Sequence, residues 1–524
     1  MIKIELVVTL DSIDGDLTQS IANMLNTESE NITSYEILKK SLDARRKSNL
    51  HWVISIAVEL KNEAKYVNKY SQYIAPKSLL SDLELPHSKK ASRVGVVGSG
   101  PAGLFAALTL IECGHKPIIF ERGAEIDTRI KDVELFESIR KLNPESNIQF
   151  GEGGAGTFSD GKLNTGLSDS LTAVVIGEFI RFGAPIDIGF IRNPHIGTDF
   201  LRNIVKNIRA FIISRGGEIR FNSKVLDLQT KNKCLLGLNV NGNIEEFDKV
   251  IFAIGHSARD TYSMLYERNI AMETKPFSMG VRIEHEQRQI NKAQYGDTIP
   301  SIPPADYKLS ANISNKRSIY TFCMCPGGSV VCGASEHSCV VTNGMSEYAR
   351  DKTNANSAVL INVTPADFGD LDPLAGMRFQ RQFEKKAYDI SNDYLLPVQR
   401  VSDFLKNKHS INFGAVLPSC TSGTVFSDLR ACLPKFVIDG LKEGLPLLNN
   451  KLNGFINRDA ILLGVETRSS APLRILRNEN GESVNLSGLY PCGEGSGYAG
   501  GITSSAIDGI KAALKISSSL LKTY

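Results

Sequence analysis

The chain has 524 residues, of which 42% are hydrophobic and 22% charged, a composition typical of soluble globular proteins. This length suggests roughly three domains, and the composition excludes a collagen-like, low-complexity or mostly disordered chain. The 60 basic and 57 acidic residues leave a net charge of +3, which disfavours a nucleic-acid partner recognised through bulk charge.

Neither secretion nor membrane insertion is expected. Residues 1–10, MIKIELVVTL, lack the basic region and the long apolar region of a signal peptide. The sequence contains no run of about 18 uninterrupted apolar residues, the length that a membrane span needs. Its nine cysteines are an odd number in a long chain, whereas secreted disulfide frameworks are short and even-numbered. We therefore expect a cytoplasmic protein without membrane contact.

The first part of the chain, residues 1–85, is expected to form a small α+β module. The sequence predicts a strand over 2–10, a helix over 17–25 and a strand with period-two alternation over 51–60. A basic cluster before the last strand could dock an anion or RNA, although a solvated surface is the commoner explanation. The cluster comprises Lys39, Lys40, Arg45, Arg46 and Lys47. A linker is predicted at 85–92, LPHSKKAS.

The strongest signal lies at 93–123, RVGVVGSGPAGLFAALTLIECGHKPIIFERG. A buried strand at 94–97 precedes a G-x-G-x-x-G turn and an apolar helix. A second strand at 116–120 then ends at Glu121. Because strand, turn, helix, strand and acid follow in the required order, this unit predicts dinucleotide binding.

Each residue of the turn has a mechanical role in such a unit. Gly98 permits the tight turn, Gly100 lets the backbone approach a pyrophosphate, and Gly103 lets the helix pack closely on the sheet. The free N–H groups at the start of the helix favour phosphate. The carboxylate of Glu121 can accept both hydroxyl hydrogens of an adenosine ribose.

The form of the turn favours FAD as the dinucleotide. With Pro101 and Ala102 it reads GSGPAG, which resembles the FAD-binding turn of two-dinucleotide-binding-domain flavoproteins more than an NAD dehydrogenase turn. Glu121 favours an adenosine with a free 2′-hydroxyl, which suits FAD and NAD alike and disfavours NADP here. Arg122, the next residue, is also expected among the cofactor-binding residues.

The remaining elements follow this unit in chain order. A helix and then a strand are predicted over 197–221, and several strands over 224–254. Residues 275–450 are expected to mix short strands, Pro-rich turns and irregular loops. A final helix is predicted over 502–521.

A second glycine-rich turn lies near the end of the chain, in GLYPCGEGSGYAGGITSSAIDGIKAA at 488–513. It looks like the C-terminal flavin motif, in which a Gly-acid pair, here Gly493 and Glu494, precedes a helix. The resemblance implies that Glu494 binds the ribitol or the pyrophosphate, and that the N–H groups of Gly501 and Ile502 face the flavin N1/O2 edge. A helix N-terminus at that edge stabilises the negative charge of a reduced flavin.

A third element is KVIFAIGHSARD at 249–260, a buried strand that leads into Gly255. The same flavoproteins have a strand ending in Ala-x-Gly beside the dinucleotide-binding turn. In such a fold, Val225 of the preceding strands lies near the adenine.

Longer runs of sequence point to one family. They are NIQFGEGGAGTFSDGKLNTG (147–166), PFSMGVRIEH (276–285), FCMCPGGSVV (322–331), GVETRSSAPLRI (464–475) and YPCGEGSGYAGGI (490–502). Together with the front module, they resemble the bacterial family of FAD-dependent dehydrogenases often labelled NAD(FAD)-utilizing, over essentially the whole chain. The resemblance names no substrate.

The resemblance implies an α/β fold with three parts. These are a doubly wound FAD/NAD(P)-binding domain of the glutathione-reductase-2 type, an inserted mixed β-rich substrate domain, and a small ferredoxin-like α+β module at the front. The expected ranges are 1–85 for the module, 93–274 and 451–524 for the FAD-binding domain, and 275–450 for the substrate domain.

The glycine-rich segment GEGGAGTFSDGKLN, at 151–164, suits a wall of the flavin pocket, where the resemblance also puts it. Gly154 is expected to contact the cofactor. Lys162 or Asp160 could contact flavin N5 or the substrate, although a loop that only packs against the cofactor is the simpler interpretation.

Two expected absences limit the chemistry. The sequence has no second strand–GxGxxG–helix unit for a nicotinamide domain, so NAD(P)H would bind transiently over the flavin. It also lacks a C-x-x-x-x-C pair after the first unit, which disfavours a dithiol relay. Cys323 and Cys325 form C-x-C, but buried strand cysteines are a better interpretation than a redox pair. No metal is expected, although Cys332, His337 and Cys339 lie close in sequence.

Several polar residues are candidates for substrate contact: His256, Arg259, Arg282, Glu284, His285, Arg468 and Ser469. Alternation in VRIEH puts Arg282 and Glu284 on one strand face, which should be exposed or line a polar cavity. The catalytic residues are not identified, and the weak candidates are Lys162, His256, Arg282 and His285.

The sequence therefore predicts an FAD-dependent oxidoreductase that transfers a hydride between non-covalent FAD and an organic small molecule. A transient NAD(P)H donor is expected, and the oligomeric state is open. A flavin-dependent RNA-modifying enzyme and a non-catalytic flavin-binding or redox-sensing protein are the alternatives.

Overall fold

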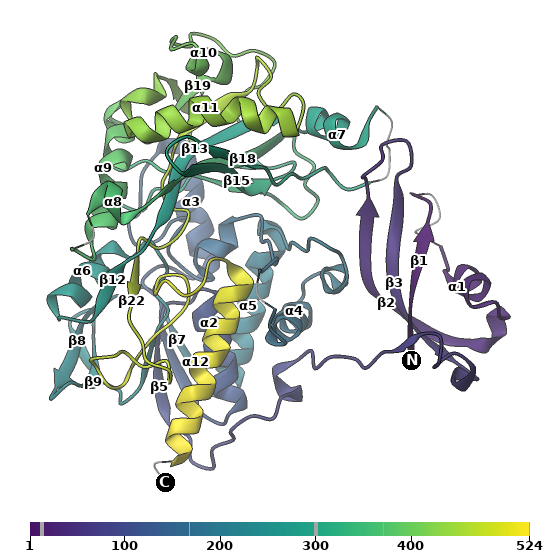
Figure 1. Ribbon diagram of the computed structural model, residues 1–524. Helices are drawn as coiled ribbons and strands as arrows, with labels where there is room; N and C mark the ends of the chain where they lie inside the picture. Colours follow the sequence, from purple (N-terminus) through teal and green to yellow (C-terminus); the bar gives the residue numbers. More distant parts are fainter. Residues whose placement is uncertain (11–14, 167, 298–301, 370, 523–524) are drawn as a thin grey trace.

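The computed structural model describes residues 1–10, 15–166, 168–297, 302–369 and 371–522 (Figure 1). Its first domain contains a parallel five-stranded sheet with the order β23-β11-β5-β6-β7. The strands are β5 (Arg93–Val97), β6 (Lys116–Phe120), β7 (Glu218–Arg220), β11 (Val250–Phe252) and β23 (Leu489–Pro491). The central strand β5 is a run of apolar residues buried on both faces, which is typical of parallel sheets.

Helices cover one face of this sheet and a small antiparallel sheet covers the other. The helices are α2 (Pro101–Glu112), α3 (Ile126–Ile139), α4 (Leu171–Arg181), α5 (Thr198–Ser214) and α12 (Ile502–Lys522). In Figure 1 the C-terminal α12 lies along α2, which it contacts closely because Gly509 has no side chain facing Ala102. The opposite face packs on β8 (Val225–Lys231), β9 (Cys234–Val240) and β10 (Asn243–Glu246) through an apolar cluster. The predicted doubly wound FAD-type fold is confirmed.

The second domain is built on a seven-stranded sheet with the order β14-β15-β18-β13-β21-β19-β20. Its strands are β13 (Phe277–Glu286), β14 (Ser310–Ile313), β15 (Arg317–Cys325), β18 (Asn354–Val363), β19 (Leu396–Arg400), β20 (Thr424–Phe426) and β21 (Ile461–Glu466). Figure 1 shows α11 (Lys435–Lys451) lying across this sheet, with α9 (Ala375–Asp389) nearby. Because β21 belongs to this sheet, the chain returns to the first domain after Glu466, whereas we expected the return at 451.

Short elements complete the two domains. β12 (Met272–Thr274) pairs with β22 (Leu473–Ile475) where the chain passes between them, and β16 (Ser329–Cys332) pairs with β17 (Thr342–Met345). The remaining helices are α6 (Arg259–Glu267), α7 (Gln287–Tyr295), α8 (Pro365–Phe368) and α10 (Val401–Leu405).

The N-terminal module contains a four-stranded antiparallel sheet with the order β2-β3-β1-β4 and one helix, α1 (Thr18–Leu25). The strands are β1 (Ile2–Val8), β2 (Ile32–Asp43), β3 (His51–Leu60) and β4 (Ser71–Gln72). The strict burial alternation of β1 explains why one face of the sheet carries the module core. The order and strand directions are those of a ferredoxin-like fold, with a 3₁₀ turn at Glu63–Lys65 in place of its second helix.

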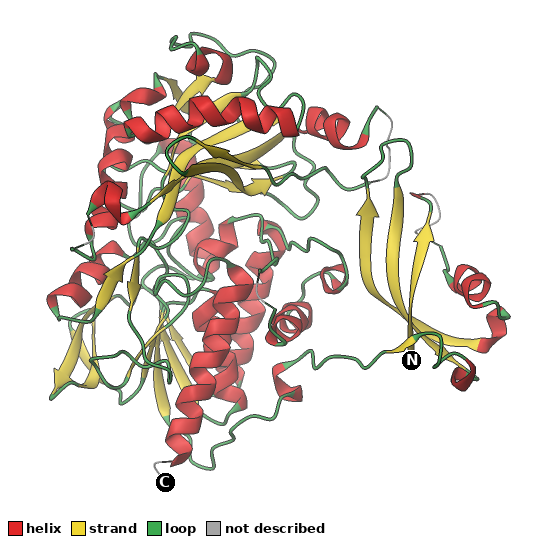
Figure 2. Cartoon of the chain, in the orientation of Figure 1, coloured by secondary structure: helices red, strands yellow, loops and turns green. Residues whose placement is uncertain are grey.

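The module lies to one side of the two domains, joined to them by a long loop (Figure 2). Along the described residues, no helix is long and apolar enough to cross a membrane.

Candidate functional site

A cavity of about 1480 Å³ runs between the parallel sheet, the second domain and the N-terminal module. Its walls include both glycine-rich turns, the strand end at Gly255 and the 151–162 segment. Most of the predicted site residues therefore share one continuous space.

The G-x-G-x-x-G turn has the geometry that its spacing predicts. Gly98 has a φ of +97°, and a Cβ there would lie 2.3 Å from the carbonyl oxygen of Ala253. A Cβ on Gly103 would lie 1.9 Å from the carbonyl oxygen of Gly98, so the helix can approach the strand only without a side chain. Gly100 differs, because the nearest atom to its Cβ position is the Cα of Gly154, 3.9 Å away. The open side of the turn at Gly100, Pro101 and Ala102 faces the cavity.

Glu121 is buried at the end of β6 and ties the turn to the 151–162 segment. Its Oε2 accepts hydrogen bonds from the N–H and hydroxyl of Ser99, at 2.9 and 2.7 Å. Its Oε1 accepts from the N–H groups of Gly123 and Gly151, at 2.9 and 3.1 Å. These four bonds engage both oxygens, so a ribose could be bound only by sharing or displacing one of them. The ribose contact of Glu121 stays a prediction.

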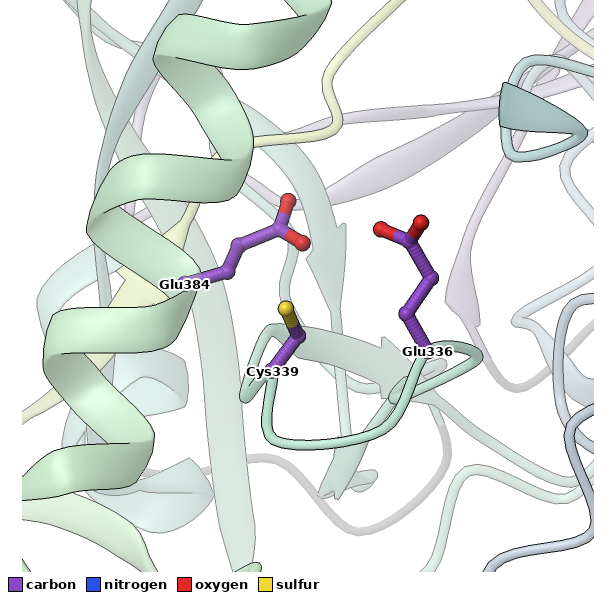
Figure 3. Close-up of side chains that lie close together, drawn as sticks. All are labelled: Glu336, Cys339 and Glu384. Carbon is purple, nitrogen blue, oxygen red and sulfur yellow. The ribbon is translucent and has the colours of Figure 1, made fainter. Parts of the chain in front are cut away.

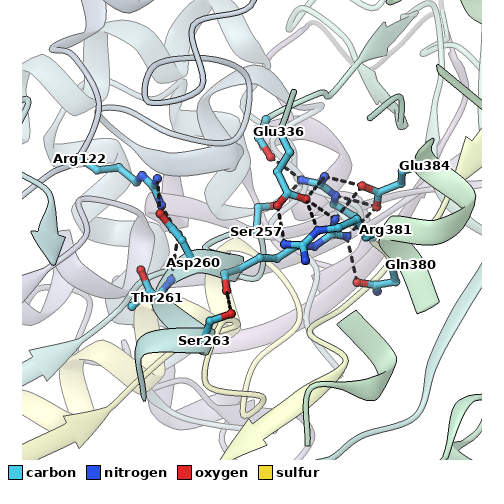
Figure 4. Close-up of polar contacts among 12 residues, drawn as sticks. Arg122, Ser257, Asp260, Thr261, Ser263, Glu336, Gln380, Arg381 and Glu384 are labelled. Carbon is cyan, nitrogen blue, oxygen red and sulfur yellow. Dashed lines mark hydrogen bonds and ion pairs between the residues drawn. The ribbon is translucent and has the colours of Figure 1, made fainter. Parts of the chain in front are cut away.

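Two other predicted contacts with the adenosine end line the cavity. Val225, at the start of β8, is buried there. Arg122 lies over the ring of Phe150, 4.1 Å from its centroid, and donates to Glu145 and Asp260 (Figure 4). Since the guanidinium of Arg122 is already paired with two carboxylates, it forms part of a rigid wall.

The C-terminal turn places an acid and a helix start at the cavity. Glu494 lines the cavity, and no hydrogen bond or ion pair joins its carboxylate to another described residue. Burial raises the pKa of Glu494 to about 7, opposed by Lys275. Gly501 directly precedes Ile502, the first residue of α12, and apart from its chain neighbours no atom of the described residues lies within 4 Å of a Cβ built on Gly501. The first N–H groups of a helix lack helical acceptors, so this end of α12 is suited to negative charge.

His256 and Arg468 form a polar wall next to Gly255. A Cβ on Gly255 would meet no atom within 4 Å. Nδ1 of His256 lies 3.0 Å from the hydroxyl of Ser257, which also accepts a hydrogen bond from Arg468 at 3.1 Å. Burial and the nearby Arg468 and Arg259 lower the pKa of His256 to about 4, so the imidazole is neutral at pH 7.

Behind this wall lies a buried ion-pair cluster around Glu384. Glu384 accepts two hydrogen bonds from Arg259, at 2.8 and 2.7 Å, and two from Arg468, at 3.0 and 2.7 Å (Figure 4). Burial alone would raise the pKa of Glu384, but the two guanidinium groups hold it well below its ordinary value. The cluster connects α6 of the first domain to α9 of the second.

Three potential ligand atoms of this cluster, from Glu336, Cys339 and Glu384, lie within 4.8 Å of one another (Figure 3). Arginines already neutralise both carboxylates, because Glu336 also accepts from Arg259 at 2.6 Å and from Arg381 at 2.7 Å. We therefore interpret the group as an ion-pair cluster rather than a metal centre.

On the opposite wall, Lys162 lines the cavity together with Cys323 and Cys325. Its ammonium donates to the carbonyl of Met324 and lies 3.9 Å from Asp160, which is paired with Arg350. Asp160 is buried by that pairing, so Lys162 is the more accessible of the two predicted contacts. The prediction of buried strand cysteines is right for Cys325 and wrong for Cys323, which is exposed to the cavity. Desolvation within the cavity raises the pKa of Cys323 to about 12, which keeps its thiol protonated at neutral pH.

Four predicted substrate contacts lie outside the cavity walls. Arg282, Glu284 and His285 are fully buried in β13, so the polar face expected there is neither exposed nor part of the cavity. Arg282 is neutralised by Glu466 at 2.8 and 3.0 Å, and Glu284 is bonded by Ser419. Arg259 is likewise held inside the ion-pair cluster.

His285 packs among Tyr307 and Phe455, where burial lowers its pKa to about 3. Ser469 does line the cavity, but its hydroxyl is bonded to the backbone of Ser278. Two residues that the sequence analysis missed also line the cavity: Glu466, which accepts from Arg282 and Thr342, and Gln149, which accepts from Ser257. Glu466 lies in the run GVETRSS and Gln149 in the run NIQFGEG, and membership of these runs is the only sequence signal that could have indicated a role for them.

The comparisons with known proteins agree with this architecture. Residues 276–469 match a family model described as "FAD-dependent protein, C-terminal domain-like". Residues 1–59 match a domain of unknown function. A Clostridium beijerinckii protein, described as an uncharacterized protein, is 46% identical to this chain over 512 residues. The alignment covers 96% of each of the two chains.

Two solved structures with low sequence identity share the fold over most of this chain. CtdE in complex with FAD has a TM-score of 0.32 and 14% identity, covering 82% of this chain and 84% of that chain. The glycerol-3-phosphate dehydrogenase of Bacillus halodurans has a TM-score of 0.35 and 11% identity, covering 83% of this chain and 66% of that one. Likeness this distant carries no functional argument.

The ion-pair cluster predicts a large effect of one substitution. Glu384→Gln keeps the shape of the side chain but removes the carboxylate that the buried Arg259 and Arg468 share, which leaves Arg259 with Glu336 alone and Arg468 without a close countercharge. The free energy of unfolding should therefore fall by about 3–5 kcal/mol. Urea denaturation measures this loss. The control is Glu336→Gln, at a carboxylate that is one-quarter exposed, where the loss should be about 1 kcal/mol. Equal losses in the two variants would contradict the assignment of Glu384 as the centre of the cluster.

Proposed function

The chain belongs to the family of FAD-dependent proteins, and we propose that it is an oxidoreductase that exchanges a hydride with an organic substrate in the cavity described above. The carrying observation is that the cavity joins both glycine-rich turns to a polar wall of the second domain. A transient nicotinamide nucleotide is the proposed donor, since the other G-x-G-x-x-G run between a strand and a helix, at 495–500, is followed by α12 and by no further strand among the described residues.

The residues present fit an extended dinucleotide. At Gly100, Gly255 and Gly501 a Cβ would project into open cavity rather than into protein. We assign the pyrophosphate to the turn at Gly98, Gly100, Pro101, Ala102 and Gly103, and the adenosine to the side of Glu121, Arg122 and Val225. Glu494, whose carboxylate has no hydrogen-bond or ion-pair partner among the described residues, is suited to accept a ribitol hydroxyl beside Gly493.

We assign the isoalloxazine ring of FAD to the start of α12. Gly154 and Lys162 are assigned to the wall on the other side of the ring. FAD supplies the acceptor and donor of the hydride when it is bound. The chain's own part is to direct the N–H groups of Gly501 and Ile502 at the N1/O2 edge and to exclude water with the buried walls.

The substrate side is assigned to Arg468, His256 and Glu466. Arg468 is fixed by Glu384 and can still orient an anionic or carbonyl group of the substrate. His256 is neutral near pH 7, and no other described residue bonds its Nε2, so it can exchange a hydrogen bond with substrate. Arg282 acts through Glu466 and is therefore a positioning residue.

The cofactor assignment predicts that Gly100→Val loses FAD. The φ of −70° at Gly100 allows any residue, and the side chain would fill the open side of the turn where the pyrophosphate is assigned. We expect the purified variant to lack flavin absorbance while the cofactor-free protein keeps its thermal midpoint. Gly166→Val is the control, because its Cβ also meets no atom within 4 Å but lies outside the cavity walls. Wild-type flavin content in Gly100→Val would refute this assignment.

The role of Glu494 predicts a pH dependence of cofactor affinity. Only the ionised carboxylate accepts a hydroxyl hydrogen with both oxygens, and a pKa of about 7 means that it ionises between pH 6 and pH 8. FAD should therefore bind the apoprotein up to about tenfold more tightly at pH 8 than at pH 6. Flavin fluorescence titration measures this, with a flat profile expected for Glu494→Gln. The exposed Glu479→Gln should keep the wild-type slope, and identical slopes in all three proteins would count against Glu494.

Anaerobic stopped-flow reduction tests the proposed reaction. Mixing the holoenzyme with NADH or with NADPH should bleach the flavin absorbance at a rate that saturates with nucleotide concentration. A metabolite screen for reoxidation then identifies acceptors that react faster than oxygen does. If neither nucleotide reduces the flavin, the nicotinamide part is wrong, and if no acceptor outpaces oxygen, a non-catalytic flavoprotein is the better interpretation.

A further inference from the structure

The outer end of the cavity is formed by the N-terminal module. The edge strand β2 pairs with residues 190–192 of the first domain through two backbone hydrogen bonds, from Lys40 N to Phe190 O at 2.7 Å and from Arg192 N to Lys40 O at 3.0 Å. This pairing brings the module against the cavity, which its residues Lys40, Leu42, Ala44, Arg45 and Trp52 help to line. The module is therefore part of the site and not only an attached domain.

Three basic side chains without an ion-pair partner lie at this end of the cavity. Lys40, Arg192 and Lys308 line the cavity, and among the described residues none of them has a carboxylate partner. Elsewhere along the walls the cations are paired, as Arg122 is with Asp260 and Arg350 with Asp160.

The nearby carboxylates are engaged by neutral groups. Asp187 accepts from the hydroxyl of Tyr348, and Asp306 accepts from the amide of Asn193 at 3.1 Å. Arg45 is paired with Asp43.

Trp52 completes this end of the cavity and is the only tryptophan of the chain. The ammonium of Lys40 lies over its ring, 4.7 Å from the centroid. The indole N–H is buried, and no acceptor for it exists among the described residues. Because this N–H is closed to solvent, a ligand in the cavity reaches other atoms of Trp52, and the ammonium of Lys40 is the group beside the indole that an acceptor ligand can pair with.

We propose that Lys40, Trp52, Arg192 and Lys308 form an anion subsite, which binds a phosphate or carboxylate group at the end of the substrate remote from its reacting carbon. The proposal rests on the proposed oxidoreductase function. The size of the cavity supports it, because about 1480 Å³ exceeds the roughly 300–1,000 Å³ of a pocket for a single small ligand. A cofactor at the glycine-rich turns would therefore leave this outer end to a second molecule.

A small anion fits this end better than RNA does. Of the five basic residues between positions 39 and 47, only Lys40 and Arg45 line the cavity, whereas Lys39, Arg46 and Lys47 are exposed. Lys40, Arg192 and Lys308 come from three separate segments and converge on the cavity, which suits one small anion, whereas Lys39, Arg46 and Lys47 lie outside its walls.

Tryptophan fluorescence of the holoenzyme tests the subsite directly, because the single indole lies in it. Inorganic pyrophosphate and glutarate serve as phosphate and carboxylate probes, and calorimetry with the same probes gives an independent affinity. We expect a saturable emission change with at least one probe. Lys40→Gln and Arg192→Gln should each weaken that binding about tenfold, since each removes a charge-assisted hydrogen bond.

Two further variants complete the experiment. Lys39→Gln removes a neighbouring exposed charge and should bind as the wild type does. Lys308→Gln lies outside the module, so it should weaken binding even if substitutions at the β2 edge loosen module docking. FAD content is measured for every protein, so that failure of the cofactor assignment is distinguished from failure of the subsite.

Three outcomes would overturn the proposal. They are no saturable change with either probe, unchanged affinity in Lys40→Gln, Arg192→Gln and Lys308→Gln, and tighter binding of a single-stranded oligonucleotide with a steep salt dependence. The last result would instead favour a nucleic-acid substrate.

Discussion

The site depends on backbone segments that approach one another more closely than side chains would allow. At the carboxyl ends of the parallel strands, Gly98 contacts the backbone of Ala253, and Gly103 contacts Gly98. The C-terminal turn approaches the strand end in the same way, since Gly495 lies against the backbone of Gly255, and it meets the first turn where Gly493 lies against Ala102. These contacts bring two segments almost four hundred residues apart to the same edge of the sheet, where the starts of α2 and α12 open onto one cavity. Without these contacts, the positive N-terminal ends of α2 and α12 would not face the same cavity.

The buried ion pairs provide the second constraint, because they fix the two domains relative to each other. Glu384 comes from α9 of the second domain, and Arg259 from α6 of the first. Arg468 belongs to the strand connection that runs back to the first domain, and it reaches both Glu384 and Ser257. Glu384 and Arg259 do not line the cavity, yet through Arg468 they fix the charge of its wall, which links the order of the domain interface to the protonation of His256.

The sequence predicted the elements whose pattern is local. The unit at 93–123, the C-terminal turn and the module strands have periodicity and glycine spacing that are complete within short segments. It could not predict partners that are distant in the chain. The charges at Arg282 and Glu284 suggested an open polar face, yet both side chains are buried with partners distant in sequence. Glu466, 184 residues away, neutralises Arg282, and Ser419, 135 residues away, donates hydrogen bonds to Glu284. The contribution of Lys40 and Trp52 to the cavity was equally hidden, because it arises from docking of the module rather than from any motif.

The pairing of β2 with residues 190–192 has a consequence for the module as a separate piece of protein. β2 is a strand of twelve residues at the edge of its sheet, and the two backbone bonds at Lys40 cover only a small part of it. The free N–H and C=O groups of an edge strand can pair with a strand of another molecule. Exposed charged side chains such as Glu36 and Lys39 oppose such pairing. Expressed without the two domains, the module would therefore have a bare edge whose resistance to self-association depends on its surface charges.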